Sequence, residues 1–498
     1  MSELQDERAR RLAKVEAERA RGRDPYPVRF DRTHTAAELH AAYDGIAAGA
    51  ETDDVVRMAG RILLVRRQGK LTFATLRDAT GTVQLFVSRG VLGDERHAEF
   101  DDLDLGDWIG VEGTVMKTKK GELSVKISAF ELLAKTLRPL PDKWHGLADV
   151  DTRFRQRYVD LVVNDDARRV LETRVATIDA LRSFLKDRAF VEVETPVLHE
   201  VIGGATAKPF STHHNALDLD LSLRIALELH LKRLVVGGYE RVFEIGRVFR
   251  NEGLGSRYNP EFTMLEAYQA FADYHDMMDL TEQMVAHAAN AAVGTARVGE
   301  GDAAVDLTPP WPRQPMLSLI REHAGVEVHP SMPREKLERI CDDLDVPREP
   351  GWGPGVLVNE IYEKTVEPNL VGPVIVYDYP REVSPLARAH HDDPDLVERF
   401  EVVVLRRELA NAFSELTDPV DQRARLEGQA ALRAQGEEEA MDVDEDYLRA
   451  LEYGLPPTGG LGLGVDRLVM LIAGVTTIRE VILFPQLRPD PRPEAGED

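Results

Sequence analysis

The sequence predicts an α+β protein with a small β-barrel followed by a larger domain of helices and strands. Short strands punctuated by glycines fill residues 55–137. Apolar residues recur at helical spacing over residues 170–185. Two runs of alternating apolar residues flank a polar loop within residues 241–268. At 498 residues the chain is also too long for one ordinary domain.

The composition excludes several classes of protein. The formal net charge of −25 argues against a protein that coats nucleic acid nonspecifically, although a local basic patch still permits an RNA partner. No stretch of about 20 apolar residues is present, so no membrane association is expected. The single cysteine, Cys341, excludes a disulfide framework and a zinc site built on cysteines. The charged N-terminus lacks an apolar signal region, which favours a cytoplasmic location.

Residues 1–34 are predicted to form a helical extension. Residues 3–23 are rich in Arg, Ala and Glu, which is typical of an exposed helix. Its basic side chains either contact RNA or, because acidic residues are interleaved with them, are simply solvated. These basic residues are Arg8, Arg10, Arg11, Lys14 and Arg19.

Residues 35–145 are predicted to form an OB-fold, a small barrel that commonly binds oligonucleotides. The strands are expected over residues 55–67, 71–87, 107–118 and 121–133. Arginines and lysines make this segment locally basic within an acidic chain. Phe73 is an aromatic side chain that can stack on an unpaired base.

The hairpin expected within residues 241–268 is the most informative feature of the chain. Side chains alternate between the faces of a strand, so residues of equal parity share a face. An arginine there can make two parallel hydrogen bonds to a phosphate, an aromatic ring can stack on a base, and a glutamate can pair with an ammonium. The hairpin therefore suits a nucleotide and a cationic substrate. Its key side chains are Arg250, Glu252, Phe262, Glu266 and Tyr268.

This hairpin resembles motif 2 of the class II aminoacyl-tRNA synthetases, in the lysine-specific form. Residues 459–471, GGLGLGVDRLVML, are interpreted as a glycine-rich turn that enters an apolar helix, and they resemble motif 3. Residues 188–198 resemble motif 1, the dimer-interface element, with Ala189 where the family usually has Gly. The resemblance implies a class II catalytic domain over residues 146–490, built on an antiparallel β-sheet flanked by helices.

Two further segments of the second domain are predicted from their patterns. Helical patterns with Pro-rich interruptions indicate a helical insertion near residues 275–345. Residues 491–498 are acidic and follow a Pro-rich stretch, so they are expected to form a short tail.

The resemblance implies an enzyme that activates L-lysine with ATP and transfers the lysyl group to the 3′ terminal ribose of lysine tRNA. Such catalysis depends mainly on positioning and charge neutralisation. By resemblance, the catalytic residues are Arg250, at the α-phosphate, and Arg467, at the γ-phosphate. Glu401 and Glu408 match the family's pair of ligands for Mg²⁺. The expected ATP site comprises Arg250, Glu252, Tyr258, Phe262 and Arg467.

A pocket for lysine must pair its buried ammonium groups with carboxylates. By resemblance, Glu266 and Glu415 bind the ε-ammonium, while Glu228 and Gly204 contact the α-amino end. Asn411, Phe413 and Glu415 share parity, so one strand face presents all three. The expected lysine-binding residues are Gly204, Glu228, Glu266, Tyr268, Asn411, Phe413 and Glu415.

The resemblance also implies a homodimer and a tRNA-binding barrel. The residues that match the family's readers of the uridine-rich anticodon are Phe73, Gln84 and Glu122. Two positions depart from the family pattern: Tyr258 replaces the usual His or Arg beside the γ-phosphate, and Leu227 replaces the usual Pro before Glu228.

Three alternatives remain at this point. An aspartyl- or asparaginyl-type ligase would need a cation in its pocket, which two glutamates oppose. A ligase that attaches lysine to proteins would lack the barrel of residues 55–137. A paralogue with a regulatory or altered RNA-binding role would have lost catalytic side chains, whereas Arg250 and Arg467 are both present.

Overall fold

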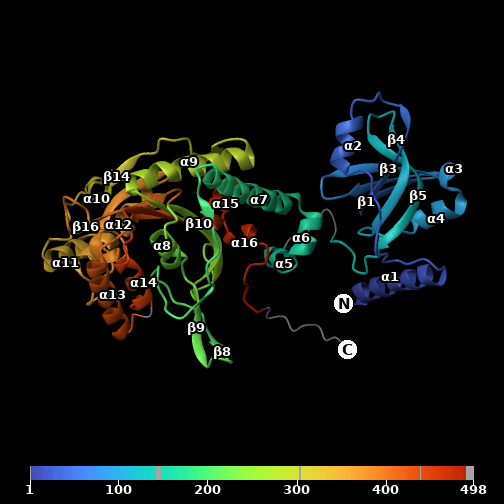
Figure 1. Ribbon diagram of the computed structural model, residues 1–498. Coiled ribbons are helices and arrows are strands. Elements are labelled where there is room, and N and C mark those ends of the chain that lie inside the picture. Colours follow the sequence, from blue (N-terminus) through green and yellow to red (C-terminus); the bar gives the residue numbers. More distant parts are fainter. Residues whose placement is uncertain (1, 142–146, 148, 302–303, 438, 490–498) are drawn as a thin grey trace. The chain divides into compact units, whose positions relative to one another are not determined.

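The structure is a computed structural model that describes residues 2–141, 147, 149–301, 304–437 and 439–489. It divides into two compact units, residues 1–148 and 149–498 (Figure 1). The expected domain boundary at residues 145 and 146 and the expected tail over residues 491–498 lie outside the described residues. Within the described ranges, no helix is long and apolar enough to span a membrane.

The first unit is a closed barrel with the strand order β1–β2–β3–β5–β4. Alternate side chains point inward, so residues such as Val56, Leu85 and Ile127 are fully buried. This barrel confirms the OB-fold prediction. Its elements are α1 (Ser2–Ala20), α2 (Ala36–Tyr43), β1 (Glu51–Gln68), β2 (Leu71–Arg77), β3 (Thr82–Ser88), α3 (Arg89–Leu92), α4 (Asp94–Asp101), β4 (Trp108–Lys117) and β5 (Leu123–Ala134).

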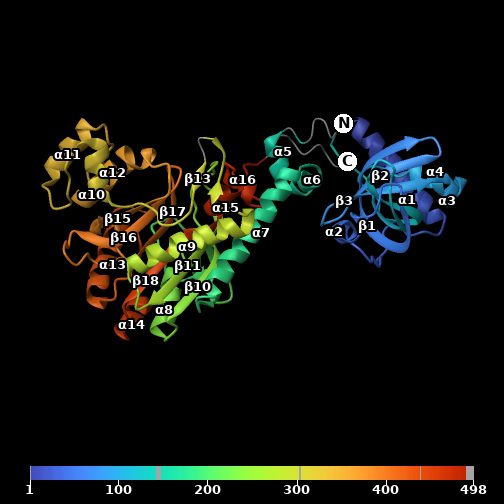
Figure 2. The same cartoon turned by 90° about the horizontal axis from the view of Figure 1, so that it is seen from above.

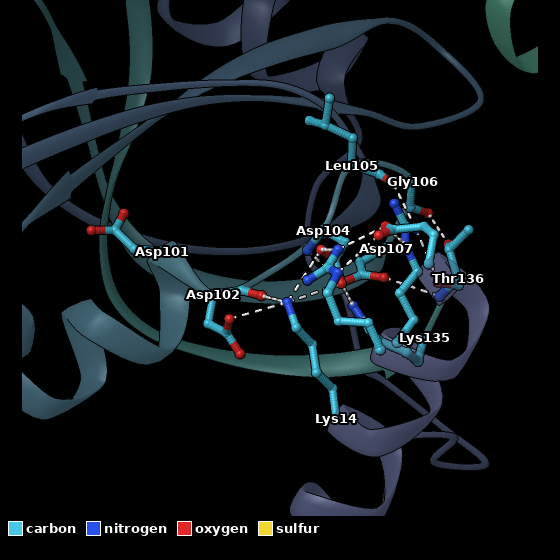
Figure 3. A network of polar contacts seen from close by, with 12 residues as sticks. Lys14, Asp101, Asp102, Asp104, Leu105, Gly106, Asp107, Lys135 and Thr136 are labelled. Atoms are coloured by element: carbon cyan, nitrogen blue, oxygen red, sulfur yellow. Dashed lines mark hydrogen bonds and ion pairs between the residues drawn. The ribbon is translucent and has the colours of Figure 1, made fainter. Parts of the chain in front are cut away.

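The N-terminal helix α1 is anchored to this barrel. Arg11 is only 4% exposed and donates a hydrogen bond to the carbonyl of Thr136 at 3.1 Å. Arg10 and Lys14 both pair with Asp104, and Figure 3 shows Lys14 reaching this network. The expectation of an exposed helix is therefore wrong at Arg11 and Lys14, whose donors bind the barrel, whereas Arg10 stays exposed although it pairs with Asp104.

The second unit is built on a sheet with the strand order β14–β15–β16–β17–β18–β11–β10–β6. Neighbouring strands are antiparallel except in the pairs β14–β15 and β10–β6, which are parallel. The sheet strands are β6 (Val191–Glu192), β10 (Arg241–Phe249), β11 (Glu261–Ala270), β14 (Arg313–Pro315), β15 (Val374–Pro380), β16 (Leu396–Val403), β17 (Glu408–Ser414) and β18 (Thr458–Gly464). The antiparallel sheet confirms the expected fold class.

Helices cover both faces of this sheet. Figures 1 and 2 show α7 (Asp165–Lys186) and α9 (Tyr274–Val293) side by side, and α15 (Val465–Ala473) joins them in one apolar core. Leu265 and Ala267 of β11 point into that core. Tyr268 points to the opposite face, which carries α8 (Glu228–Val236) and α14 (Glu445–Glu452). The functional side chains described below lie on the α8 face.

A further helical cluster lies at the β14 and β15 end of the sheet and contains α10 (Met316–Ala324), α11 (Arg334–Asp343) and α12 (Pro354–Thr365) (Figure 2). The predicted stretch 275–345 therefore includes α9, a core helix, together with α10 and α11 of this cluster. The remaining elements are α5 (Val150–Arg155), α6 (Arg157–Val163), β7 (Leu198–His199), β8 (Ser211–His214), β9 (Leu219–Leu223), β12 (Arg297–Val298), β13 (Val305–Asp306), η2 (Glu367–Asn369), η3 (Arg381–Val383), α13 (Pro419–Ala434) and α16 (Ile478–Val481).

The expected hairpin is present, whereas the expected glycine-rich turn is not. Strands β10 and β11 pair in antiparallel register from Arg241 and Gln269 to Phe249 and Glu261. Residues 459–464 instead form most of β18, a central strand between β17 and β11. Glycine is usually depleted in strands, so the sequence pattern favoured a turn.

Candidate active site

A cavity of about 450 Å³ opens on the α8 face of the sheet. The structure brings to this cavity every residue that was predicted for ATP, lysine or Mg²⁺, except Glu415. The predicted residues that line it are Gly204, Glu228, Arg250, Glu252, Tyr258, Phe262, Glu266, Tyr268, Glu401, Glu408, Asn411, Phe413 and Arg467.

Two glycines of β18 form the floor of the cavity. Gly462 pairs with Glu266 of β11 on one side and with Asn411 of β17 on the other. Gly460 lies opposite Tyr268 in the same way. Residues directly opposite each other share a face of the sheet, so the absent side chains leave room between the polar groups of the outer strands. This requirement explains why a central strand contains so many glycines.

Glu266 is 4% exposed and held from two directions. The hydroxyl of Tyr268 donates a hydrogen bond to Glu266 Oε2 at 3.0 Å, and the backbone N–H of Leu227 donates to Oε1 at 2.9 Å. Burial, reinforced by the neighbouring carboxylate of Glu228, raises the pKa of Glu266 to about 7. A carboxylate that is this costly to ionise gains strongly from a cationic partner.

Glu415 lies on the α8 face of the sheet, over Gly460. Neither it nor Lys232 is among the described residues that line the cavity. A Cβ added to Gly460 would lie 1.9 Å from Glu415 Oε1 and 2.7 Å from Tyr268 Cε1, so that oxygen lies over the floor on the same face as Tyr268. Its other oxygen forms an ion pair with Lys232, whose ammonium also donates to Glu228 Oε1 at 2.5 Å. Glu415 therefore lies beside the cavity with its carboxylate engaged by an internal lysine, and its contact with a substrate stays a prediction.

Arginines and an aromatic ring lie toward the other end of the site. The guanidinium carbon of Arg250 lies 5.2 Å from the centre of the Phe262 ring. Burial lowers the pKa of Arg250 from its ordinary value. A guanidinium nevertheless keeps its proton in proteins, so Arg250 stays positively charged. Arg467 of α15 donates to the backbone carbonyl of Glu408 at 2.7 Å. These cations and the ring can receive the phosphates and the base of a nucleotide.

Glu401 and Glu408 offer oxygen ligands on the adjacent strands β16 and β17. Burial raises the pKa of Glu401 to about 7; the charge on Arg399 opposes this shift and that on Glu408 adds to it. Carboxylates that repel each other in a buried site suit a hard cation, so this donor set fits Mg²⁺. Among the described residues, no group of three or more His, Cys, Asp or Glu side chains is placed to hold a metal ion. Such a site would complete its coordination with waters and phosphate oxygens.

Two predicted ATP contacts lie in exposed positions. Glu252 is exposed, and Tyr258 is 53% exposed within the loop between β10 and β11. The side chains of this loop are therefore open to solvent, and a nucleotide has access to them. Arg257 lines the same cavity next to Tyr258 and provides a cation that Tyr258 lacks.

The sequence reasoning did not identify Arg399 and Lys232. Arg399 donates to Asn411 Oδ1 at 3.0 Å and pairs with Glu401, so it orients two predicted site residues. Its position two residues before Glu401 on one strand was the available signal. The position of Lys232 on an otherwise apolar helix face gave no comparable signal.

On the barrel, the structure gathers the predicted anticodon residues on the outer surface of neighbouring strands. Phe73 of β2 pairs with Phe86 of β3, and their rings meet edge to face at 5.5 Å. Gln84 lies on the same face of β3 and donates to Ser124 of β5 at 2.9 Å. Glu122 is exposed immediately before β5. This surface presents an aromatic ring and polar groups together, as single-stranded nucleic acid recognition requires.

Comparison with known proteins assigns both units to families. Residues 56–133 match the OB-fold nucleic acid binding domain of the tRNA anticodon family. Residues 149–488 match the family of class II tRNA synthetases for D, K and N.

Full-length relatives extend this similarity. The chain is 52% identical over 491 residues to a lysine–tRNA ligase of a Synechococcus strain, covering 98% of this chain and 100% of the relative. It is 51% identical to a lysine–tRNA ligase of Moorella thermoacetica, covering 96% of this chain and 97% of the relative. The chain therefore belongs to the class II tRNA synthetases of the D, K and N group, which confirms the family predicted from its motifs.

Proposed function

We propose that the enzyme is a lysine–tRNA ligase that activates L-lysine with ATP and transfers it to lysine tRNA. The observation that carries this proposal is the division of charge in one cavity. Glu266 lies further along β11 than Phe262, and Glu228 acts on its carboxyl. Arg250 lies over the Phe262 ring, and Arg467 follows Gly464, which pairs with Met264 toward that same end of β11. The relatives named above as lysine–tRNA ligases support the same assignment.

In the first reaction, a carboxylate oxygen of lysine attacks the α-phosphate of ATP, and pyrophosphate leaves as the bond between the α- and β-phosphates breaks. Arg250 is proposed to hold the α-phosphate and the attacking carboxylate together, because a guanidinium can bind two oxygens at once. Phe262 is proposed to stack on the adenine with Glu252 beside it, and Tyr258 is proposed to lie beside the γ-phosphate. Arg467 is proposed to neutralise the γ-phosphate.

The amino-acid end is proposed to select lysine by charge. Glu266 and Tyr268, together with Glu415 beside them, are assigned to the ε-ammonium. Glu228 and the backbone at Gly204 are assigned to the α-amino group. The contact surface for the methylene stem is proposed to come from Phe413, with Asn411 at its side.

The pocket does not suit an acidic or amide side chain. Two cations at the amino-acid end are already paired: Lys232 with Glu228 and Glu415, and Arg399 with Glu401. An aspartate would therefore meet a surplus of negative charge.

In the second reaction, a hydroxyl of the 3′ terminal ribose attacks the lysyl carbonyl and releases AMP. Phe73, Gln84 and Glu122 are proposed to read the anticodon of lysine tRNA at the barrel. Mg²⁺ is the proposed cofactor, bound by Glu401 and Glu408, and it would neutralise phosphate charge. Glu401→Gln is expected to raise the Mg²⁺ concentration needed for half-maximal activity.

A homodimer is proposed through the segment that resembles motif 1. Val191 lies in β6 at the edge of the large sheet, Leu198 lies in β7 at the edge of the three-stranded sheet and Val197 precedes it, and each is at least 40% exposed. Apolar residues gathered at a sheet edge are typical of an interface. A cytoplasmic location is proposed because lysine tRNA and ATP are the substrates.

Amino-acid-dependent ATP–pyrophosphate exchange tests the function. Lysine is expected to support exchange, and aspartate and asparagine are not. Exchange with aspartate instead of lysine would contradict the assignment, and no exchange with any amino acid would favour a regulatory paralogue.

A further inference from the structure

An internal lysine lies at the amino-acid end of the active site. Lys232 of α8 is 0% exposed, and its ammonium contacts both Glu228, one turn earlier on the helix, and Glu415, which follows β17. Glutamate and lysine four residues apart commonly pair on exposed helices. The pair of Glu228 and Lys232 differs because it is buried and because Lys232 also contacts Glu415, which comes from another element.

Stability alone does not account for this arrangement. A buried ion pair gains little over well-packed apolar side chains, because removing both charges from water is costly. Lys232 is surrounded by suitable apolar partners, with its ammonium 5.4 Å from the centre of the Phe413 ring and 5.9 Å from that of Tyr447. An apolar residue would therefore pack at this position.

The charges of the pocket suggest another role. Burial raises the pKa of Glu228, Glu266 and Glu415, and the charge of Lys232 opposes this shift at Glu228 and Glu415. When all three are ionised, they contribute three negative charges and Lys232 contributes one positive charge, so two negative charges are left over. The pair of Arg399 with Glu401 adds no net charge. Substrate lysine carries two ammonium groups, and its carboxylate belongs with Arg250 at the nucleotide end. The two excess negative charges of the pocket therefore match the two positive charges of the substrate's ammonium groups.

We propose that Lys232 is a positioning and specificity-determining residue for lysine recognition, which holds Glu228 and Glu415 ionised and leaves the pocket two negative charges. It acts through these two glutamates, because Lys232 is not among the described residues that line the cavity. The inference rests on the proposed lysine specificity. The inference adds that selection of lysine depends on the net charge of the pocket as well as on the residues that contact lysine.

Removing the internal ammonium should change how the pocket titrates. Three buried carboxylates without Lys232 cannot all stay ionised at neutral pH, so one retains a proton. The pocket then has less negative charge than the two ammonium groups of lysine require. The missing charge returns as the pH rises, because the third carboxyl loses its proton. The other groups that face this cluster are Tyr268 of β11, Tyr447 of α14, Arg399 of β16 and Arg250, which follows β10. Burial raises the pKa of both tyrosines above the ordinary value, so they stay neutral throughout this range.

The experiment compares Lys232→Met with the wild-type enzyme in ATP–pyrophosphate exchange from about pH 6.5 to about pH 9. The KM for lysine is expected to rise by about tenfold or more near neutral pH, with the KM for ATP unchanged. The kcat/KM for lysine should increase more steeply with pH than in the wild type. A merely structural role would lower kcat or thermal stability and leave the lysine KM and its pH profile unaltered. That result in a folded Lys232→Met enzyme would overturn the proposal.

Lys232→Arg provides a second, independent test because it keeps the positive charge. This test is also available when Lys232→Met does not fold. The proposal expects Lys232→Arg to retain the wild-type pH profile. A profile that steepens with pH in this variant would overturn the role assigned to charge.

The barrel offers a matched control. Lys135 is also buried and contacts two carboxylates, those of Asp104 and Asp107, as Figure 3 shows. Lys135→Met should lower thermal stability without changing the lysine KM. The wild-type assay separates the two levels of the proposal, because absence of lysine-dependent exchange in the unaltered enzyme would refute the proposed function itself.

Discussion

Arg467 donates hydrogen bonds to Glu408 twice, to the backbone carbonyl at 2.7 Å and to the carboxylate at 3.1 Å. The contact joins the first turn of α15 to the start of β17. It therefore links the residue proposed for the γ-phosphate to one of the two proposed for Mg²⁺. Arg467 and Glu408 therefore hold each other's side chains in position before any ligand binds.

Arg467→Lys should weaken ATP binding while leaving lysine binding intact. A lysine keeps the positive charge but loses the planar set of donors that reaches Glu408 and a phosphate together. The KM for ATP is expected to rise by about tenfold or more, which corresponds to the loss of a charge-assisted hydrogen bond. Exchange kinetics at varied ATP and at varied lysine check this, and an unchanged KM for ATP would remove Arg467 from the nucleotide site.

Lysine recognition should depend on pH through Glu266. Its pKa is raised to about 7, chiefly by burial, so the empty site gains a proton as the pH falls through that value. Only the ionised carboxylate pairs with an ammonium, so kcat/KM for lysine should fall below about pH 7 and level off above it. Glu266→Gln should cost about 2–4 kcal/mol in lysine recognition and abolish this inflection. An inflection that persists in Glu266→Gln would assign it to another group.

Leu227 contributes through its backbone. Its N–H donates to Glu266 Oε1 at 2.9 Å, and a proline at this position has no N–H to donate. Leu227→Pro should therefore raise the pKa of Glu266 further and move the inflection in kcat/KM for lysine to higher pH. Leu227→Ala keeps the N–H and is the matched control. The same inflection in both variants would show that this hydrogen bond does not tune Glu266.

Gly460 should tolerate no side chain. A Cβ there would lie 1.9 Å from Glu415 Oε1 and 2.7 Å from Tyr268 Cε1, so Gly460→Ala must displace two pocket side chains. The KM for lysine is expected to rise by about tenfold or more. Gly428 has nothing within 4 Å of the same added atom, so Gly428→Ala should leave the kinetics unchanged. Equal lysine KM values in the two variants would contradict the tight floor described above.

Phe73 should matter for tRNA and not for activation of the amino acid. Phe73→Ala removes the ring that is proposed to stack on an anticodon base, a contact worth about 1–3 kcal/mol. The KM for lysine tRNA should rise by about fivefold to a hundredfold, while ATP–pyrophosphate exchange without tRNA stays at the wild-type rate. A normal KM for tRNA would place anticodon recognition elsewhere on the barrel.

Local patterns in the sequence predicted much of the fold. The hairpin of β10 and β11 was predicted from alternation alone, and the barrel from closely spaced short strands. Both predictions succeeded because strand alternation is a local property that neighbouring residues display. The family assignment followed from the order of three motifs and is confirmed by the matched family model.

The errors arose where tertiary contacts override local preference. Glycines at 459, 460, 462 and 464 indicated a turn, yet they lie in a strand. At Gly460 a side chain would collide with Glu415 and Tyr268 over the cavity floor, and at Gly459 it would crowd Met277 of α9 on the opposite face. Lys232 was missed because only the folded chain brings Glu415 against α8. For the same reason, no periodicity indicated that Glu415 is engaged by Lys232 beside the cavity.

Charging of tRNA with labelled lysine tests the central claim most directly, because it requires the cavity and the barrel to work in one reaction. The wild-type enzyme is expected to attach lysine to lysine tRNA in the presence of ATP and Mg²⁺, and to attach neither aspartate nor asparagine to the tRNAs of those amino acids. Transfer of aspartate or asparagine, or no transfer of lysine to lysine tRNA, would contradict the account.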